Sequence, residues 1–224
     1  MAQPRLPRLT RPGSTPRTTV RRIPAKTVRE TGVLYAILDA GLVAHVAVTG
    51  PDGQPFVLPV GYARDGHAVL FHGSTGSRLF QGLAAGAPTC LTVTLLDGIV
   101  LARSAFESSM NYRSVMVLGT CSVLTGPDKE VALERITEHL LPGRWADARH
   151  PSKKESAATI VVSLPLTETS VKVNDGPPDD DEADLALPIW AGNVPIEERF
   201  GRPVAAPDLT GAFDVPDYVK RWRR

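Results

Sequence analysis

Short apolar runs, separated by residues that favour turns, fill the first half of the chain. Three such runs occupy positions 42–49, 56–62 and 67–72. Pro51-Asp52-Gly53 separates the first run from the second, and Arg64-Asp65-Gly66 separates the second from the third. Segments with Asp-Gly between apolar runs are typical of tight hairpin turns. The pattern therefore predicts three consecutive antiparallel strands.

A helical pattern precedes these strands. Thr27 and Glu30 have the spacing of a capping box, in which two side chains satisfy free amide groups of the first helical turn. Apolar residues then recur at helical spacing, at Val33, Leu34, Ile37 and Leu38. Gly41 follows as a stop signal. The spacing predicts a helix that begins at Thr27 and ends before Gly41.

The rest of the central part continues with short strands and few helices. In chain order, the pattern predicts a helix at 77–85, strands at 89–96 and 99–102 that form a hairpin around Asp97-Gly98, a strand at 114–125, a helix capped by Asp128, and a strand at 159–164. Many strands at short intervals are typical of a β-barrel or sandwich rather than of alternating βαβ units. We therefore expect a mainly β fold with peripheral helices over residues 27–173.

The two ends of the chain differ from this central part. Residues 1–26 alternate prolines with arginines and offer no apolar face, so we expect a disordered basic leader, with weak polyanion binding as the alternative for such a charge run. Residues 174–224 begin with prolines and the acidic run 179–182, which we expect to be solvated. Large apolar residues follow, so we expect this C-terminal extension to pack on the barrel or on a dimer partner: Leu185, Leu187, Ile189, Trp190, Phe200, Phe213, Tyr218 and Trp222.

Composition narrows the function classes. The 224 residues, with a mass of 24.0 kDa, suit one domain with tails. The 25 Lys and Arg against 24 Asp and Glu give no general attraction to nucleic acid or membranes, and we expect neither as a partner. Cys90 and Cys121 lie in apolar runs, as buried cysteines do in a reducing compartment. No run of about 18 apolar residues and no secretory h-region occur, so we expect a cytoplasmic protein.

One segment has the chemistry of an anion site. Residues 70–79 leave a predicted strand, pass two glycines and enter a predicted helix. Glycines allow backbone amides to approach an anion, hydroxyls donate to it, and a guanidinium matches the geometry of phosphate. The residues that supply these groups are Gly73, Ser74, Thr75, Gly76, Ser77 and Arg78. The alternative is an ordinary glycine-rich loop with Ser77 as helix N-cap. Neither of the usual nucleotide-loop motifs is present.

Three short motifs resemble those of one family. Gly76-Ser77-Arg78 is similar to the phosphate-binding segment of the FMN-binding split barrels related to pyridoxamine 5′-phosphate oxidase. Segment 112–119 resembles their Arg-x-Val-x-Val-x-Gly strand, and Trp190-Ala191-Gly192 resembles their late Trp-x-Gly. Phe71-His72-Gly73 is similar to the segment of the flavin-nucleotide-binding, 5-nitroimidazole reductase-like subgroup. The resemblance implies an antiparallel, six-stranded Greek-key split barrel that binds FMN between the two subunits of a homodimer.

The resemblance also implies roles for single residues. Ser74, Gly76, Ser77 and Arg78 would bind the FMN phosphate. The remaining cofactor-binding candidates are the backbone of Pro59, Val60 and Gly61 together with Phe71, His72, Tyr112, Arg113, Ser114 and Trp190, and His72 is also the catalytic candidate. Leu79 stands where the oxidase has lysine, and the arginines that follow Trp-x-Gly in the oxidase are missing here. We therefore do not expect oxidation of vitamin B6.

These observations favour an FMN-dependent oxidoreductase, of the nitroreductase type that reduces small electron-poor molecules. A non-catalytic flavin-binding or storage protein and a haem-binding split barrel are the alternatives. A lone histidine at a strand end is more often a structural residue than a catalyst, so the assignment of His72 depends on its surroundings. The histidines His45, His67, His139 and His150 lack metal-site spacing, and no protein metal site is predicted.

Overall fold

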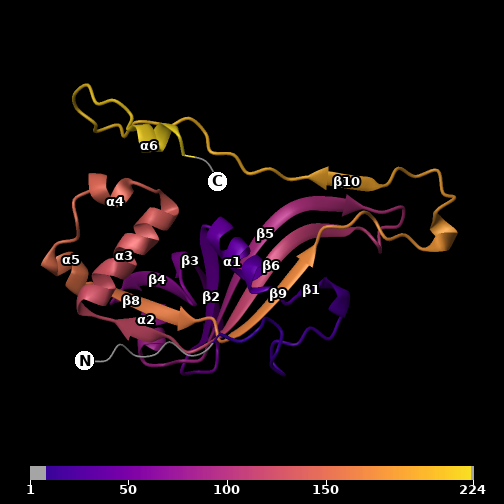
Figure 1. Cartoon of the computed structure of the whole chain (residues 1–224), viewed down its shortest axis with the longest axis horizontal. Coiled ribbons are helices and arrows are strands. Elements are labelled where there is room, and N and C mark those ends of the chain that lie inside the picture. The colour runs from indigo at the N-terminus through magenta and orange to yellow at the C-terminus, as the bar shows by residue number, and fades with distance from the viewer. Residues whose placement is uncertain (1–8, 223–224) are drawn as a thin grey trace.

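The computed structural model describes residues 9–222 and shows one large antiparallel sheet with helices around it (Figure 1). The strands in this part of the chain are β1 Thr27–Val28, β2 Val43–Thr49, β3 Pro55–Asp65, β4 Ala68–Ser74, β5 Thr89–Leu101, β6 Ser109–Gly119, β7 Ser122–Leu124, β8 Thr159–Pro165, β9 Glu168–Asn174 and β10 Gly192–Pro195. The α-helices are α1 Thr31–Ala40, α2 Arg78–Ala84, α3 Gly126–Leu140, α4 Arg144–Asp147, α5 Lys153–Ala157 and α6 Asp217–Lys220, with 3-10 turns at Pro24–Lys26 and Glu182–Asp184. None of the helices in residues 9–222 is long and apolar enough to cross a membrane.

The sheet splits where β3 and β4 part. Its order is β1-β9-β6-β5-β2-β3-β4-β8-β7, with β10 added on β5. Strand β3 pairs with β4 only from Tyr62 to Asp65, and its earlier residues Pro55 to Gly61 pair with β2 instead. Strand β4 pairs with β8 along its whole length. The predicted architecture, a mainly antiparallel split barrel with peripheral helices, is confirmed. Among residues 9–222, ten strands take part rather than six, because short edge segments add to the central ones.

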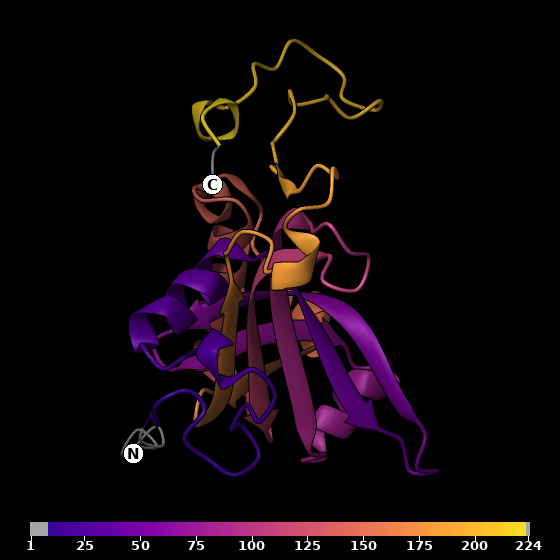
Figure 2. The same cartoon turned by 90° about the vertical axis from the view of Figure 1, so that its right-hand side faces the viewer.

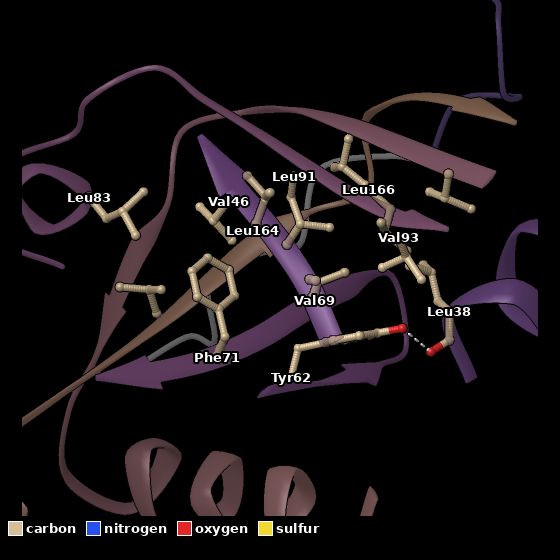
Figure 3. Close-up of a cluster of buried hydrophobic side chains, with 14 of the residues drawn as sticks. Leu38, Val46, Tyr62, Val69, Phe71, Leu83, Leu91, Val93, Leu164 and Leu166 are labelled. Carbon is tan, nitrogen blue, oxygen red and sulfur yellow. Dashed lines mark hydrogen bonds between the residues drawn. The ribbon is translucent and has the colours of Figure 1, made fainter. Parts of the chain in front are cut away.

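Two apolar clusters hold the sheet in place. Tyr62 and Phe71 face the larger cluster inside the barrel, and the Tyr62 hydroxyl donates to the carbonyl of Leu38 at 2.6 Å (Figure 3). Leu70 and Ala63 point to the other side, where α3 covers them. Because successive side chains of a strand alternate between faces, a strand buried on both sides carries an unbroken apolar run. Residues 68–71 are such a run.

The N-terminal helix is shorter than predicted. Thr27 does not cap it but lies in β1, where Thr27 pairs with Lys172 of β9. Helix α1 begins at Thr31 with Glu30 as N-cap, and Gly41 is its C-cap as expected. The capping-box interpretation was therefore wrong, because pairing with an edge strand fixes the backbone of Thr27 in an extended conformation.

The predicted hairpin around Asp97-Gly98 is also wrong. Strand β5 runs through both residues, and the register with β6 shifts between Leu96 and Gly98. A side chain on Gly98 would meet the carbonyl oxygen of Val194 at 2.9 Å, so this glycine serves the close approach of β10. Other boundaries also differ: the strand predicted at 114–125 is two strands, β6 and β7, and β9 had no clear sequence signal.

In the described residues 9–26, the leader forms hydrogen bonds with the sheet. Thr10 donates to the carbonyl of Thr167, the amide of Gly13 donates to the carbonyl of Thr169 at 2.7 Å, and Thr18 is buried. These bonds lie along the edge of β9, which β1 covers only in part. A free sheet edge leaves backbone groups unpaired, and the leader satisfies them despite its proline and arginine content. Residues 1–8 of the leader predicted to be disordered lie outside the described range.

The C-terminal extension contacts the barrel at separate places. Strand β10 pairs with β5, and the Tyr218 hydroxyl donates to the Asp147 carboxylate of α4 at 2.6 Å. Between these contacts the chain runs above the barrel (Figures 1 and 2). Asp180 forms an ion pair with Arg103 at 2.8 Å and its side chain is only 2% exposed. The acidic run is therefore anchored at this residue rather than solvated throughout.

Candidate functional site

The predicted phosphate segment lies at the split. Ser74 ends β4, Ser77 is the N-cap of α2, and Arg78 is the first residue of that helix. The Ser77 side chain makes no capping hydrogen bond, so its hydroxyl is available to a ligand. The Arg78 guanidinium is exposed, lies 5.9 Å from the centre of the Phe56 ring, and has no ion pair within residues 9–222. Two side chains suited to an anion thus stand together.

The backbone amides of this segment are already occupied. The amide of Thr75 donates to the carbonyl of Ala158 at 2.9 Å, that of Gly76 to the Ser74 hydroxyl at 3.1 Å, and that of Ser77 to the Ser74 carbonyl at 3.0 Å. These amides are therefore not available to an anion, and any phosphate bound here would depend on side chains.

Gly73 also differs from its predicted role as part of that cradle. It is a glycine because an added Cβ would overlap the ring of Phe80. The Phe80 ring is buried and helps to fix α2 over the end of β4. Gly73 therefore positions the phosphate segment through packing rather than by binding a ligand.

An exposed outer face carries most of the other predicted residues. In antiparallel strands, directly paired residues point to the same face. His45 pairs with Pro59 on one side and Thr92 on the other, and the same face continues through β6 to Lys172 on β9. Alternation along the strands places the following predicted residues on it: Pro59, Gly61, His72, Tyr112 and Ser114.

Three predicted side chains point to the opposite face. Phe71 is fully buried in the core beside Phe80, with ring centres 6.0 Å apart, and Val60 packs against the same cluster. The Arg113 guanidinium donates two hydrogen bonds to the Asp97 carboxylate, at 2.7 and 2.9 Å. These bonds raise the pKa of Arg113 and keep it charged. The side chains of these residues cannot meet a ligand on the outer face, although the backbone of Val60 remains at the split.

The predicted site is divided within one chain. His72 lies on β4 and Ser114 on β6, and strands β3, β2 and β5 lie between them. The two strands are therefore four strand spacings apart, or about 19 Å along the sheet. Trp190 packs on Gly192, which pairs with Leu101 at the far end of β5, about 40 Å along that strand from its start. One chain therefore presents the phosphate segment on one side and Ser114 and Trp190 elsewhere.

Two histidines have no polar partner in the described part of the chain. His45 and His72 both stand on the outer face, and desolvation by neighbouring atoms lowers the pKa of His72. The other described histidines are engaged: His67 with the Tyr35 hydroxyl, His139 with the Gly41 carbonyl, and His150 stacked on Trp145. A neutral imidazole with a free nitrogen can accept a metal or exchange a proton.

The surroundings of His72 are apolar on the side of β3. Gly61 offers no side chain, and Leu140 at the end of α3 lies 3.6 Å from where a Gly61 Cβ would be. Val43 pairs with Gly61 and is 48% exposed. Within residues 9–222, no three His, Cys, Asp or Glu side chains gather as a metal site.

Sequence reasoning missed a pocket beside Arg78. It has a volume of about 640 Å³ and lies between the β2–β3 turn and α2. Its lining residues are Val48, Thr49, Gly50, Pro51, Asp52, Gln54, Phe56, Arg78, Gln81 and Gly82. The Pro-Asp-Gly signal identified the turn, but only the packing of α2 against that turn forms the pocket.

Comparisons with known proteins give a consistent picture. The family model described as pyridoxamine 5′-phosphate oxidase matches residues 30–173. The chain is 40% identical to the FAD and heme binding protein from Mycobacterium smegmatis, over 87% of this chain and 95% of that one, with a TM-score of 0.83. It is 39% identical to the flavocytochrome Anf3 from Azotobacter vinelandii, over 96% and 99% of the two chains, with a TM-score of 0.88.

A more distant structure shares the fold. A protein from Bacteroides thetaiotaomicron described as a putative 5-nitroimidazole antibiotic resistance protein is 20% identical, with a TM-score of 0.56, over 66% of this chain and 86% of that one. The comparison with curated proteins finds no match.

Proposed function

Because this chain belongs to the pyridoxamine 5′-phosphate oxidase family, we propose that it binds a flavin at the split and acts as a flavin-dependent oxidoreductase. The observation that carries the proposal is the pair of unengaged donors, Ser77 and Arg78, beside the edge of β3 that β4 leaves unpaired. These side chains suit a phosphate, and the backbone of Pro59 to Gly61 suits the polar edge of a ring. The bound flavin would supply the electron transfer, and the chain would position it.

The identity of the flavin is a separate question. FMN was the expectation from the sequence motifs. The Mycobacterium smegmatis protein, which is 40% identical along nearly its whole length, is described as binding FAD. Both flavins carry the same isoalloxazine ring and a phosphate on the ribityl chain, so the donors at the split serve either one. We favour FAD for this chain.

Haem is the second part of the proposal. One similar protein is described as binding heme and another as a flavocytochrome. His72 would be the residue that holds the haem iron, because its imidazole is unengaged in the described residues and desolvation lowers its pKa, which favours the neutral ring. Ligation requires an unprotonated nitrogen. The exposed apolar side chains of Val43 and Leu140 suit the edge of a macrocycle.

A nitroreductase-type enzyme that binds flavin but no haem is the alternative to a protein that binds both. In that case His72 would donate a proton to an acceptor at the flavin rather than ligate iron, since one imidazole nitrogen cannot do both at once. A flavin-storage protein would need neither role. The three possibilities differ in what the purified protein absorbs and whether it turns over.

The absorption spectrum of freshly purified protein tests the proposal. We expect a flavin band in the blue together with a Soret band, and we expect both to change when a reductant and then oxygen are added. Released cofactor can be identified as FAD or FMN by chromatography. A flavin band without a Soret band would remove the haem part, and the absence of both bands in protein refilled with flavin and haemin would contradict the whole proposal.

We also propose that two chains complete the site. The phosphate segment of one chain is far from its own Ser114 and Trp190, and Trp190 is 68% exposed. A two-fold dimer can bring the second set of a partner to the first set of this chain. Light scattering should therefore give about twice 24.0 kDa at micromolar concentration. A monomer that binds flavin tightly would contradict this arrangement.

A further inference from the structure

The pocket beside Arg78 adjoins the proposed phosphate position. Arg78 belongs to both the phosphate segment and the pocket lining. The volume of about 640 Å³ lies within the range of small-molecule sites, about 300–1,000 Å³. A ligand that continues beyond its first phosphate would pass Arg78 and enter this pocket.

The lining has the groups that a nucleoside requires. The Phe56 ring offers a stacking surface with the Arg78 guanidinium near its face. Gln81 uses its amide nitrogen to bond the carbonyl of Thr75 at 2.8 Å, which leaves its amide oxygen to accept from an exocyclic amine. Asp52 and Gln54 lie on the β2–β3 turn opposite α2 and can bond ribose hydroxyls.

Gly82 in the pocket lining indicates that the open volume of the pocket has a function. It lies inside α2, where glycine is less favourable than alanine by about 1 kcal/mol. No steric reason requires it, since a Cβ at this position would have only the Ala87 Cβ near it, at 4.0 Å. The position borders the pocket, so the missing side chain keeps the pocket open.

We propose that this pocket binds the adenosine monophosphate half of FAD, with Phe56 stacked on the base, and that it makes the chain prefer FAD to FMN. The proposal rests on the flavin binding proposed above. It adds that residues outside the phosphate segment, Phe56 and Gly82 above all, determine which flavin is bound.

The test compares FMN and FAD binding to flavin-free full-length protein by quenching of flavin fluorescence. Gly82→Phe should fill the pocket and weaken FAD about tenfold to a hundredfold while FMN affinity changes less than about twofold, because base stacking of this kind is worth that much. Gly82→Ala is the matched control and should leave both affinities unchanged. Phe56→Leu keeps an apolar side chain against the core and should also weaken FAD alone.

The outcomes separate this proposal from the flavin proposal. Equal losses of FMN and FAD in Gly82→Phe, or no loss of FAD in either variant, would overturn the adenosine site while leaving flavin binding intact. Wild-type protein that binds FMN and FAD equally would also overturn it. Wild-type protein that binds neither flavin would overturn both proposals together.

Discussion

Replacing His72 with alanine is expected to remove the haem while leaving the flavin in place. The His72 imidazole is unengaged in the described residues, and no other described histidine lies on β4 to hold the iron in its place. Soret absorbance per chain should fall to about a tenth or less, as loss of a first ligand exceeds the 10–100-fold effect of ligand-orienting groups. The flavin band should stay within about twofold of the wild type, because the phosphate donors lie on another segment.

His45→Ala is the matched control for this experiment. His45 lies on the same outer face, is also unengaged in the described residues, and pairs with Pro59 beside the split. It should keep its haem. Loss of haem in His45→Ala with retention in His72→Ala would contradict the assignment and give the ligand role to His45. Added imidazole should restore part of the Soret band in His72→Ala only.

Acid titration gives a second readout of the same ligand. Desolvation lowers the pKa of His72 in the folded chain below its ordinary value near 6.5. Iron needs the unprotonated ring and competes with protons for it, so haem should stay bound at pH 7 and be released only at acidic pH, below the lowered pKa of His72. The folded state is also disfavoured there, since the unfolded chain takes up the proton first.

In protein that lacks a Soret band, His72→Ala should instead slow reoxidation of reduced flavin by a nitroaromatic acceptor, by about 10²-fold or more if the imidazole is the proton donor.

Local signals in the sequence identified most strands but not the split. The hairpins at 51–53 and 64–66 follow from turn residues between apolar runs, and both are present. The split arises because β3 and β4 stop pairing with each other beyond Tyr62 and Phe71, where β3 pairs with β2 while β4 continues along β8, far away in the chain. Pairing of this kind has no local signature, so only the resemblance to a family suggested it.

The same cause explains the two elements that were wrong. Thr27 has a good capping pattern, yet pairing with β9 overrides it. Asp97-Gly98 has a good turn pattern, yet β10 pairs with β5 at this point and needs a glycine for close approach. In each case a distant segment fixed the backbone and a local preference of a few tenths to 1 kcal/mol was insufficient.

For the candidate site, strand alternation in the sequence already limits which neighbouring side chains can share a ligand. Arg113 and Ser114 are neighbours in a strand, as are Phe71 and His72, so the members of each pair must point to opposite faces. They could not both contact one ligand through their side chains. By contrast, the pocket at Phe56 and Gly82 depends on how α2 packs against a turn, and no local pattern in the sequence indicates that packing.

Replacing Arg78 with alanine is expected to weaken FMN and FAD alike. The guanidinium is exposed and unpaired in the described residues, so the fold should lose little stability, and the melting temperature should stay close to that of the wild type. A hydrogen bond between a charged donor and phosphate is worth about 1.5–3 kcal/mol, which corresponds to a loss of affinity of about tenfold to a hundredfold. Titration of flavin-free protein with each flavin measures it directly.

Arg78→Lys provides the graded control, because lysine keeps the charge but lacks the planar fork that binds phosphate through two donors. The flavin affinity of Arg78→Lys should fall between those of the wild type and Arg78→Ala. The loss of affinity in each variant should become smaller as salt concentration rises, since screening weakens the charged contact in the wild type. Arg78→Ala should reduce FMN and FAD binding by similar factors, whereas Gly82→Phe should act on FAD alone. Unchanged FMN affinity in Arg78→Ala would show that the phosphate lies elsewhere, and the adenosine pocket would then lose the neighbour that connects it to the flavin.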